Sequence, residues 1–485
     1  MEASPPARQA WGWFVPALLA STAVAKAVLA WAYPGFSSGD DLEIVETAAH
    51  YAIGFPYEPW GIRSLLHPIV LAAPFVWMGN LFGMRGPEAA VVLATIPTTL
   101  FSTASIWIVW RLTRALGWSE SVGRASAFLY AAHSLTLAYG AMPYPRPVST
   151  ALLLGAFLLL APREVGRGAA FAAGIACAAA MAVRWSEGVM ILPLLAFGAW
   201  RARRVAVIAS VLAGFVVGLA VFAGLFDLWT WGRPFASLVA FVRFCLDPSA
   251  WGWVRPPRRW YWYGSNILGW AGPILVLLTV CALKDARARL PLAIAATAVA
   301  LLSFSPVKQP RYMQIVIPFL AMAAALGWEA LRRSLPWLAT VVLIAAVPVG
   351  LERTLHLLRR KSLSATAAAR ALADMSNPPR AVALEQAWAY GERLYLGPDA
   401  SLRDVAPRTP LPVETVLAAA SGAQALALYT EDSSPELERA LGNGWRRCET
   451  LQIADSPGVT LYVPVGNPCP RVRPGEGLTA AQPRS

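Results

Sequence analysis

Twelve segments rich in apolar residues follow one another along the first 350 positions, and short polar stretches separate them. Several are about 20 residues long, the length that an α-helix needs to cross a bilayer. The pattern predicts an α-helical protein that crosses the membrane many times. The segments are Trp11–Ala32, Leu66–Gly83, Ala89–Trp110, Val122–Gly140, Val148–Ala161, Ala169–Val183, Val189–Trp200, Val205–Phe226, Ile267–Leu283, Leu290–Phe304, Met313–Leu331 and Trp337–Val349.

Basic residues in the connecting loops predict the orientation of these segments, since cytoplasmic loops carry an excess of Lys and Arg. Five loops are basic, and they fall on one side only if Leu66–Gly83, which contains Pro68 and Pro74, does not cross. We therefore expect eleven transmembrane helices, an interfacial helix at Leu66–Gly83, a cytoplasmic N-terminus and an extracytoplasmic C-terminus. Trp11–Ala32 is expected to remain as the first span, because no cleavage site follows a short apolar core.

The pattern changes after residue 350. Residues 351–375 predict one amphipathic connecting helix that ends at a pair of prolines. Residues 376–470 alternate between short apolar runs and helical patterns, which predicts a small extracytoplasmic α/β domain. The expected strands of this domain are 380–386, 392–397, 424–430 and 458–465. Its expected helices are 412–421 and 434–442. Cys448 and Cys469 in this domain are either a disulfide or two thiols, and residues 471–485 are expected to be a disordered tail.

Composition agrees with a membrane protein. Of the 485 residues 57% are hydrophobic and 14% are charged, with a mean hydropathy of +0.50. The net charge of +13 lies largely in short loops, so it is attributed to membrane orientation, and no nucleic-acid partner is expected. The four histidines have no metal-ligand spacing and no nucleotide-binding glycine loop is present. We expect no His- or Cys-based metal site and no cofactor; a site made of oxygen ligands stays open.

Four carboxylates lie within seven residues directly after the first apolar segment: Asp40, Asp41, Glu43 and Glu46. They are typical of a helix N-terminus, which favours negative charge. On the predicted topology these carboxylates lie in the extracytoplasmic loop 33–84, and the loops 142–149, 227–264 and 303–314 lie on the same side. These loops and the helix break at residue 184 carry several cations: Arg63, Arg146, Arg184, Lys308 and Arg311. A carboxylate there can act as a general base on a hydroxyl group, and cations can hold the phosphate of a lipid-linked donor.

Four blocks in this order resemble glycosyltransferase family 22 of the GT-C class, which includes the lumenal mannosyltransferases of glycolipid-anchor and N-glycan assembly and bacterial relatives. The blocks are "DDLEIVETAAHYAIG" with "IRSLLHPIV", "YPRPVSTALL", "DLWTWGRP" with "RRWYWYGSN", and "SPVKQPRYMQIVIP". The resemblance covers about residues 11–350. The last block departs from the family, since Val307 stands where His is usual and Gln309 where Glu is usual.

The resemblance implies a GT-C transmembrane domain over residues 1–350 and an active site on the extracytoplasmic face. The implied reaction moves a sugar, usually mannose, from a polyprenyl-phosphate carrier to a glycan or glycolipid acceptor, with inversion and without a metal. Asp40 is the first candidate for the general base and Asp41 the second or its partner. The expected donor-phosphate ligands are Lys308, Arg311, Arg63, Arg146 and Arg184, and the expected substrate contacts are Glu43, His50, Tyr312, Trp260 and Tyr261.

Several of these residues have a structural interpretation as well. Arg63 can anchor an interfacial helix, and Arg146 between two prolines can order its loop. Arg184 and Glu187 can form an ion pair within the bundle. His50 can be a hydrogen-bonded structural residue, and the run Trp260 to Tyr263 has the composition of a membrane-interface belt.

Other functions remain open at this point. A transporter of lipid-linked sugars usually shows two related halves, and this chain shows none. An inactive assembly subunit and a GT-C transferase of arabinose, glucose or aminoarabinose also fit. The alanine- and arginine-rich composition with brief loops suggests a bacterial protein of the plasma membrane.

Overall fold

The computed structural model describes residues 12–37, 39–247, 258–305, 307–361, 363–385, 391–397, 399–405, 411–453 and 456–471. The chain divides into two compact units. The first unit comprises Met1–Leu29, Pro59–Leu71 and Thr95–Thr354, and the second comprises Ala30–Glu58, Ala72–Ala94 and Leu355–Ser485. The expected disordered tail, apart from Arg471, lies outside the described residues.

The first unit is helical. Among the described residues, five helices are long and apolar enough to cross a membrane: Phe14–Ala32, Pro87–Ala115, Val205–Trp231, Ala286–Ser303 and Pro336–Arg359. This confirms a protein with many membrane helices, whereas the number of eleven spans stays a prediction. The helices that lie wholly or partly in this unit are α1 (Phe14–Ala32), α4 (Pro87–Ala115), α5 (Glu120–Ala131), α6 (Ser134–Gly140), α7 (Arg146–Leu160), α8 (Arg167–Val183), α9 (Ile191–Ala202), α10 (Val205–Leu219), α11 (Phe226–Trp231), α12 (Ala236–Leu246), α13 (Trp262–Ser265), α14 (Ile267–Trp270), α15 (Pro273–Ala282), α16 (Arg289–Ser303), α17 (Ile317–Ser334) and α18 (Pro336–Arg359).

Short turns of other helix types join several of these helices. They are the π-helical turns η1 (His67–Ala72) and η3 (Ala220–Leu225) and the 3₁₀ turns η2 (Trp185–Met190), η5 (Ala286–Ala288) and η6 (Pro310–Ile315). The expected single helix over 122–140 is divided into α5 and α6, because the ring of His133 accepts a hydrogen bond from the backbone of Leu135 and so starts a new helix.

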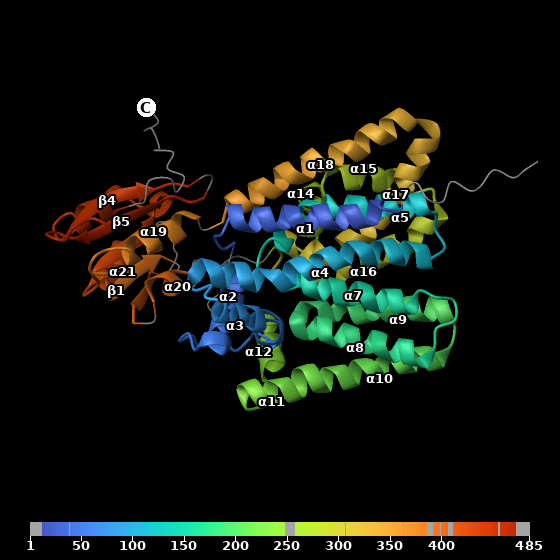
Figure 1. Cartoon of the computed structure of the whole chain (residues 1–485), viewed down its shortest axis with the longest axis horizontal. Helices are drawn as coiled ribbons and strands as arrows, with labels where there is room; N and C mark the ends of the chain where they lie inside the picture. The colour runs from blue at the N-terminus through green and yellow to red at the C-terminus, as the bar shows by residue number, and fades with distance from the viewer. Residues whose placement is uncertain are drawn as a thin grey trace, which may run out of the picture. The chain divides into compact units, whose positions relative to one another are not determined.

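Helix packing in this unit depends on small residues. Helix α8 lies between α7 and α10 (Figure 1). A Cβ at Gly174 would lie 2.0 Å from the carbonyl oxygen of Val211, and one at Gly214 would lie 2.0 Å from that of Phe171. Helices α8 and α10 therefore approach so closely that only glycine fits on both sides, which is typical of helix pairs in membranes.

The second unit contains the only sheet that the described residues form. Its strands are β1 (Ala381–Glu385), β2 (Ser401–Val405), β3 (Ala425–Tyr429), β4 (Trp445–Leu451) and β5 (Val459–Pro464), in the order β2-β1-β3-β5-β4. β1 pairs in parallel with β2 and β3, and β5 pairs antiparallel with β3 and β4. The helices of this unit are α2 (Gly39–Ile53), α3 (Ala73–Leu81), α19 (Leu363–Ala373), α20 (Glu392–Leu396), α21 (Val413–Ala420) and α22 (Pro435–Leu441), with the turn η7 (Thr430–Asp432).

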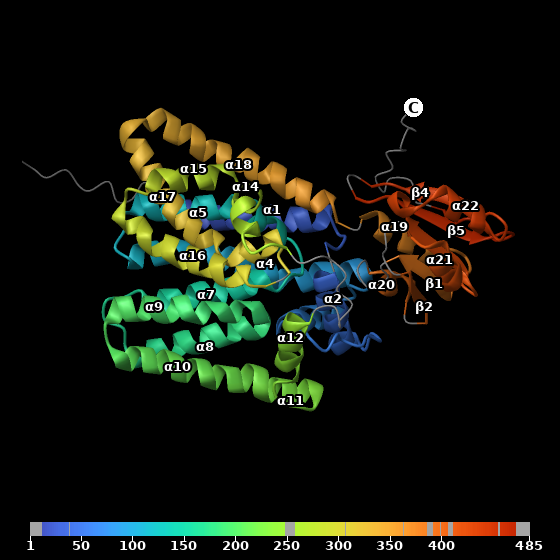
Figure 2. The same cartoon turned by 180° about the vertical axis from the view of Figure 1, so that it is seen from behind.

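The sheet is covered on both faces. Alanines of α19 pack with Val382, Leu384 and Leu461 on one face, whereas α21 and α22 pack with Leu426 and Leu428 on the other. The strands, α21 and α22 occupy the orange-to-red end of the chain in Figure 2. Cys448 and Cys469 form a disulfide, which decides between the two sequence-based alternatives.

Two expectations for this part of the chain are wrong. Residues 351–375 do not form one helix, since α18 ends at Arg359 and α19 begins at Leu363. The break is held by tertiary contacts: the Lys361 ammonium donates to the Tyr33 carbonyl, and Ser364 hydrogen-bonds with Ile453 and Ser456. Residues 392–397 form helix α20 instead of a strand, because Gly391 at a φ of +85° starts a turn there and Leu394 is buried. The strands β2 and β4 were not expected.

We expect Gly214→Ala to lower the thermal unfolding midpoint of the detergent-purified protein, because its methyl group would force α8 and α10 apart. The cost should be about 1–3 kcal/mol. Gly155→Ala in α7 is the matched control, since nothing lies within 4 Å of its added Cβ. An unchanged midpoint in Gly214→Ala would contradict the close approach of the two helices.

Candidate functional site

Helix α2 of the second unit carries the four carboxylates, and we call it the carboxylate helix. Asp40 and Asp41 lie in its first turn, where the helix dipole favours negative charge. Asp40, Asp41, Glu43 and Glu46 are all buried, with exposed fractions of 8%, 0%, 8% and 6%. Buried carboxylates are costly unless partners compensate them, so each one requires an explanation.

The two neighbouring aspartates point in different directions from the carboxylate helix. The Asp41 carboxylate accepts hydrogen bonds from the Ser37 backbone N–H at 2.7 Å and from the Ser37 hydroxyl at 3.1 Å. It also attracts the buried ammonium of Lys361, whose pKa burial lowers to about 8 against the opposing effect of Asp41. Asp40, one residue earlier, points about 100° away around the helix. Asp41 is therefore committed to the turn that precedes the helix.

Glu46 and His50 lie further along the carboxylate helix. Burial raises the pKa of Glu46 to about 8; Glu43 raises it further, and Arg393 of α20 opposes the shift. His50 is half-buried, and its Nδ1 lies 2.7 Å from the carbonyl oxygen of Phe55, to which it donates. This bond fits the structural interpretation of His50.

In the first unit, Arg146 is the centre of a buried polar cluster. The guanidinium donates to the Glu187 carboxylate at 2.5 Å and to the Ser186 hydroxyl at 3.1 Å, and it lies 4.3 Å from the centre of the Tyr312 ring. Arg146 and Glu187 are both fully buried. Among the described residues, neither Arg146 Nε nor Glu187 Oε2 has a hydrogen-bond partner. These two atoms remain able to contact a ligand.

Lys308 and Arg258 hold each other's loops in the same unit. The Lys308 ammonium donates to the carbonyl oxygens of Arg258 at 3.0 Å and of Ser305 at 2.5 Å, and Arg258 donates back to the Lys308 carbonyl at 2.8 Å. Burial lowers the pKa of Lys308. Tyr263 interacts electrostatically with Arg146, Arg258 and Tyr312, which joins this pair to the Arg146 cluster.

The other expected site residues of this unit are distributed more widely. Arg311 lies 5.6 Å from the ring of Tyr144, two residues before Arg146, and Arg184 interacts electrostatically with Glu187, whose short ion pair is with Arg146. The guanidinium of Arg63 lies 5.1 Å from the Trp60 ring, which agrees with an anchoring role. Trp260 and Tyr261 are exposed by 74% and 42%, as an interface belt would be.

Three charged residues with site contacts were not expected from the sequence: Arg258, Lys361 and Arg393. Arg258 stands in the quoted block "RRWYWYGSN", so its place beside a tyrosine-rich run was a usable signal. Lys361 and Arg393 are separated from the carboxylate helix by more than 300 residues, and nothing in the local sequence distinguishes them from other basic residues.

A model of the Alg9-like mannosyltransferase family matches residues 43–383, which is more than half of the chain. The chain belongs to the Alg9-like mannosyltransferase family. The matched range includes most of the carboxylate helix, the Arg146 cluster and Lys308. No curated protein is matched by this sequence.

Solved structures of GT-C glycosyltransferases resemble this family member in fold. ArnT from Cupriavidus metallidurans bound to undecaprenyl phosphate has a TM-score of 0.62 at 15% identity, over 93% of this chain and 98% of that chain. The arabinofuranosyltransferase AftD from Mycobacteria has a TM-score of 0.53 at 17% identity, and the match covers 93% of this chain and 40% of that chain. The oligosaccharyltransferase from Archaeoglobus fulgidus has a TM-score of 0.51 at 11% identity, and the match covers 87% of this chain and 70% of that chain. This family member is thus a membrane glycosyltransferase with the GT-C fold.

We expect the unfolding midpoint of the wild-type protein to fall as the pH rises from about 5 to about 8. The pKa of Glu46 is raised from 4.5 to about 8 by folding, so its contribution is fully present below pH 4.5 and is lost as the pH rises through 8. In detergent-purified Glu46→Gln, the fall of the unfolding midpoint between pH 5 and pH 8 should be smaller than in wild type by roughly 4 °C or more. Glu414→Gln, at an exposed position of the same unit, is the control; equal pH slopes in wild type and Glu46→Gln would contradict the assignment.

Removing one partner of the Arg146–Glu187 pair should be strongly destabilising. We expect Arg146→Met to lower the free energy of unfolding by about 3–5 kcal/mol, because it leaves a buried carboxylate without its cation. The double variant Arg146→Met/Glu187→Leu should recover part of this loss in thermal unfolding. Arg124→Met, which breaks a half-exposed ion pair with Glu120, should cost no more than about 1 kcal/mol. The single variant Glu187→Leu completes the comparison. If the double variant loses as much free energy of unfolding as the two single variants together, the residues are not a coupled pair.

Proposed function

We propose that this protein transfers a mannosyl residue from a polyprenyl-phosphate carrier to a hydroxyl group of a glycan or glycolipid acceptor, with inversion at the anomeric carbon. Membership in a mannosyltransferase family supports mannose, and the likeness to a fold that is found with undecaprenyl phosphate in ArnT supports a lipid-linked donor. The observation that carries the residue assignment is the engagement of Asp41 by Ser37 and Lys361 at the start of the carboxylate helix.

Asp40 is the general base in this proposal. Asp41 is engaged by Ser37 and attracts Lys361, so its carboxylate stabilises the turn before the helix. Asp40 then accepts the proton of the acceptor hydroxyl while the hydroxyl oxygen attacks the anomeric carbon. The bond between this carbon and the phosphate oxygen breaks, and the polyprenyl phosphate leaves with the bonding electrons.

The donor phosphate is assigned to the cations of the first unit. Arg146 starts helix α7, Arg311 lies in the turn η6 that packs against α7, and Lys308 lies just before η6. A guanidinium can bind phosphate oxygens with two parallel hydrogen bonds. Their charge stabilises the negative charge that the leaving phosphate gains in the transition state. Arg184 and Arg63 are secondary candidates. Glu43, His50, Tyr312, Trp260 and Tyr261 are proposed substrate contacts.

The reaction is proposed to take place on the extracytoplasmic face of a bacterial plasma membrane. The disulfide between Cys448 and Cys469 supports this side, because disulfides persist in oxidising compartments. Residues 1–350 are proposed as the GT-C transmembrane domain, with the loops 33–84 and 227–264 on this face. Residues 376–470 would then form the extracytoplasmic domain.

The test is transfer of radiolabelled mannose from synthetic polyprenyl-phosphate-mannose into a membrane lipid extract. With purified protein, Asp40→Asn should lose more than about a hundredfold in rate, a typical contribution of a general base. Asp41→Asn should lose less and should also lower the unfolding midpoint, because it disturbs the turn. Arabinose and glucose carriers are assayed in parallel, and transfer from one of these but not from the mannose carrier would correct the sugar.

If Asp40→Asn and Asp41→Asn lose the same transfer rate, Asp40 cannot be assigned as the general base. The different roles proposed for the two aspartates would then be contradicted. If wild type transfers no sugar from any of the three carriers, the proposed reaction is wrong. Thermal unfolding of each variant is measured alongside, so that a misfolded protein is not mistaken for an inactive one.

A further inference from the structure

The turn that leads into the carboxylate helix is held at both ends. At its start, the carbonyl oxygen of Tyr33 accepts a hydrogen bond from the Lys361 ammonium at 2.7 Å. At its end, Ser37 donates through its backbone and its hydroxyl to Asp41. Lys361 also attracts Asp41 electrostatically. One buried lysine therefore interacts with both the first residue of the turn and the carboxylate that closes it.

Lys361 lies in the short link between α18 and α19, and its exposed fraction is 1%. Removing an ammonium from water is costly, and burial lowers the pKa of this group to about 8. A buried cation is stable when an opposite charge and hydrogen bonds replace its water shell. Asp41 supplies the charge, and the Tyr33 carbonyl supplies a hydrogen bond.

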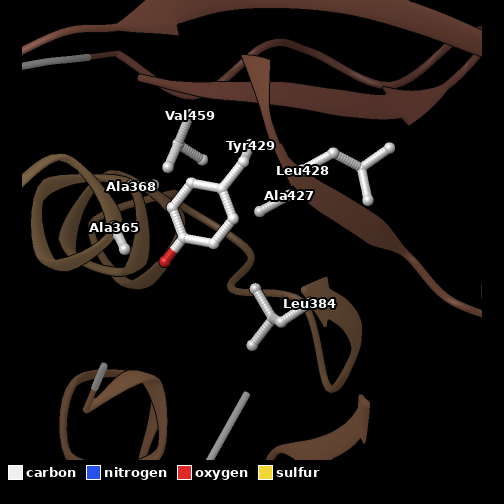
Figure 3. Close-up of a pocket in the computed structure, with 7 residues that line it drawn as sticks. All are labelled: Ala365, Ala368, Leu384, Ala427, Leu428, Tyr429 and Val459. Atoms are coloured by element: carbon white, nitrogen blue, oxygen red, sulfur yellow. The ribbon is translucent and has the colours of Figure 1, made fainter. Parts of the chain in front are cut away.

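The connection between β4 and β5 holds the chain just after this lysine. The backbone N–H of Ser364, three residues later, donates to the Ser456 hydroxyl at 3.2 Å, and its own hydroxyl accepts from the Ile453 backbone at 3.0 Å. The next turn of α19 presents Ala365 and Ala368 to the sheet. In Figure 3 they lie beside Tyr429 and Val459, around a cavity that is too small for a ligand. The start of α19 is therefore anchored directly to the strands.

A second contact from the same domain reaches the middle of the turn. Phe36 is fully buried, and a Cβ at Gly391 would lie 2.5 Å from the Cε2 atom of its ring. Gly391 has a φ of +85° and begins helix α20. Arg393 of this helix interacts with Glu46 of the carboxylate helix. The C-terminal domain thus contacts the turn through a ring and the helix through a charge.

We propose that Lys361 is a positioning residue for the transfer reaction: by holding Tyr33 and balancing Asp41, it sets the first turn of the carboxylate helix and hence the direction of Asp40. This inference rests on the proposed function, in which Asp40 is the base. It gives the C-terminal α/β domain, to which the start of α19 is anchored, a role in catalysis. A displacement of about 1 Å at a reacting group can cost roughly a hundredfold in rate.

The charge of Lys361 also has a consequence for pH dependence. Charged groups that interact with these carboxylates include Lys361 beside Asp41, Arg393 beside Glu46, and the other carboxylates of the helix. A cation favours the ionised form of a nearby carboxylate. Loss of Lys361 should therefore raise the pH at which the carboxylates at the start of this helix become protonated.

The experiment compares Lys361→Met and Lys361→Arg with the wild-type full-length protein in detergent. We expect Lys361→Met to lower kcat by roughly ten- to hundredfold with the KM for the mannose carrier changed less than about threefold, because the donor-phosphate cations are untouched. The acidic limb of its kcat/KM profile should move to higher pH, and Lys361→Arg should restore that limb. Arg360→Met is the matched control: it is the adjacent cation, is exposed, and should behave as wild type.

Amide hydrogen exchange of residues 33–46 supplies a readout that does not require activity. Exchange should become faster in this segment in Lys361→Met and stay unchanged in Arg360→Met. If wild type transfers no sugar, the proposed function fails, and the exchange result still shows whether Lys361 holds the turn. Wild-type kinetics, pH profile and exchange in Lys361→Met would overturn the inference.

The double variant Lys361→Met/Asp41→Asn covers the case in which Lys361→Met does not fold, since it removes both buried charges together. If Lys361 acts through Asp41, the double variant should lose no more activity than Asp41→Asn alone. Independent losses that multiply would contradict a shared action and overturn the proposal.

Discussion

Charge that is withdrawn from water determines the organisation of both units. The first unit buries Arg146 against Glu187, and the second buries Asp41 beside Lys361. An unpaired ion in such surroundings would cost several kcal/mol, so each charge requires a partner at a fixed place. The helices that carry these partners are thereby fixed in register, which a purely apolar interface between membrane helices does not specify.

The surrounding elements are built to deliver these partners. Helix α7 begins at Arg146, so the cation stands at the start of a helix that α8 covers, and the chain returns through η2 to supply Glu187. In the second unit the helix break after Arg359 turns Lys361 inward before α19 starts. Both arrangements place a charged residue at the junction of two helices, where the backbone can turn to direct the side chain. Glycines fill the contacts that are too close for any side chain, as between α8 and α10.

The sequence predicted the features that are written in local patterns. Apolar segments predicted the membrane helices, and the runs 380–386, 424–430 and 458–465 predicted β1, β3 and β5. The motif blocks led to the family that the residues 43–383 match. The break at Lys361 and the helix at Glu392–Leu396 were missed because long-range contacts decide them against the local pattern. The edge strand β4 was missed because its two arginines and its glutamate are typical of a polar loop. Its pairing with β5 nevertheless makes it a strand. For the site, residue types identified the cations, whereas Glu187 was paired from sequence with Arg184, three residues before it, and its short ion pair is with the distant Arg146.

The composition of the second unit has a consequence for protein engineering. Its residues come from three separate stretches of the chain, 30–58, 72–94 and 355–485, and the first and last of these interlock through Phe36 with Gly391 and through Tyr33 with Lys361. A chimera that exchanges only the C-terminal domain between two relatives would therefore separate residues that fit each other by shape and by charge. The transplantable module is the C-terminal domain together with the loop and helix that follow the first span, and a functional exchange has to carry both.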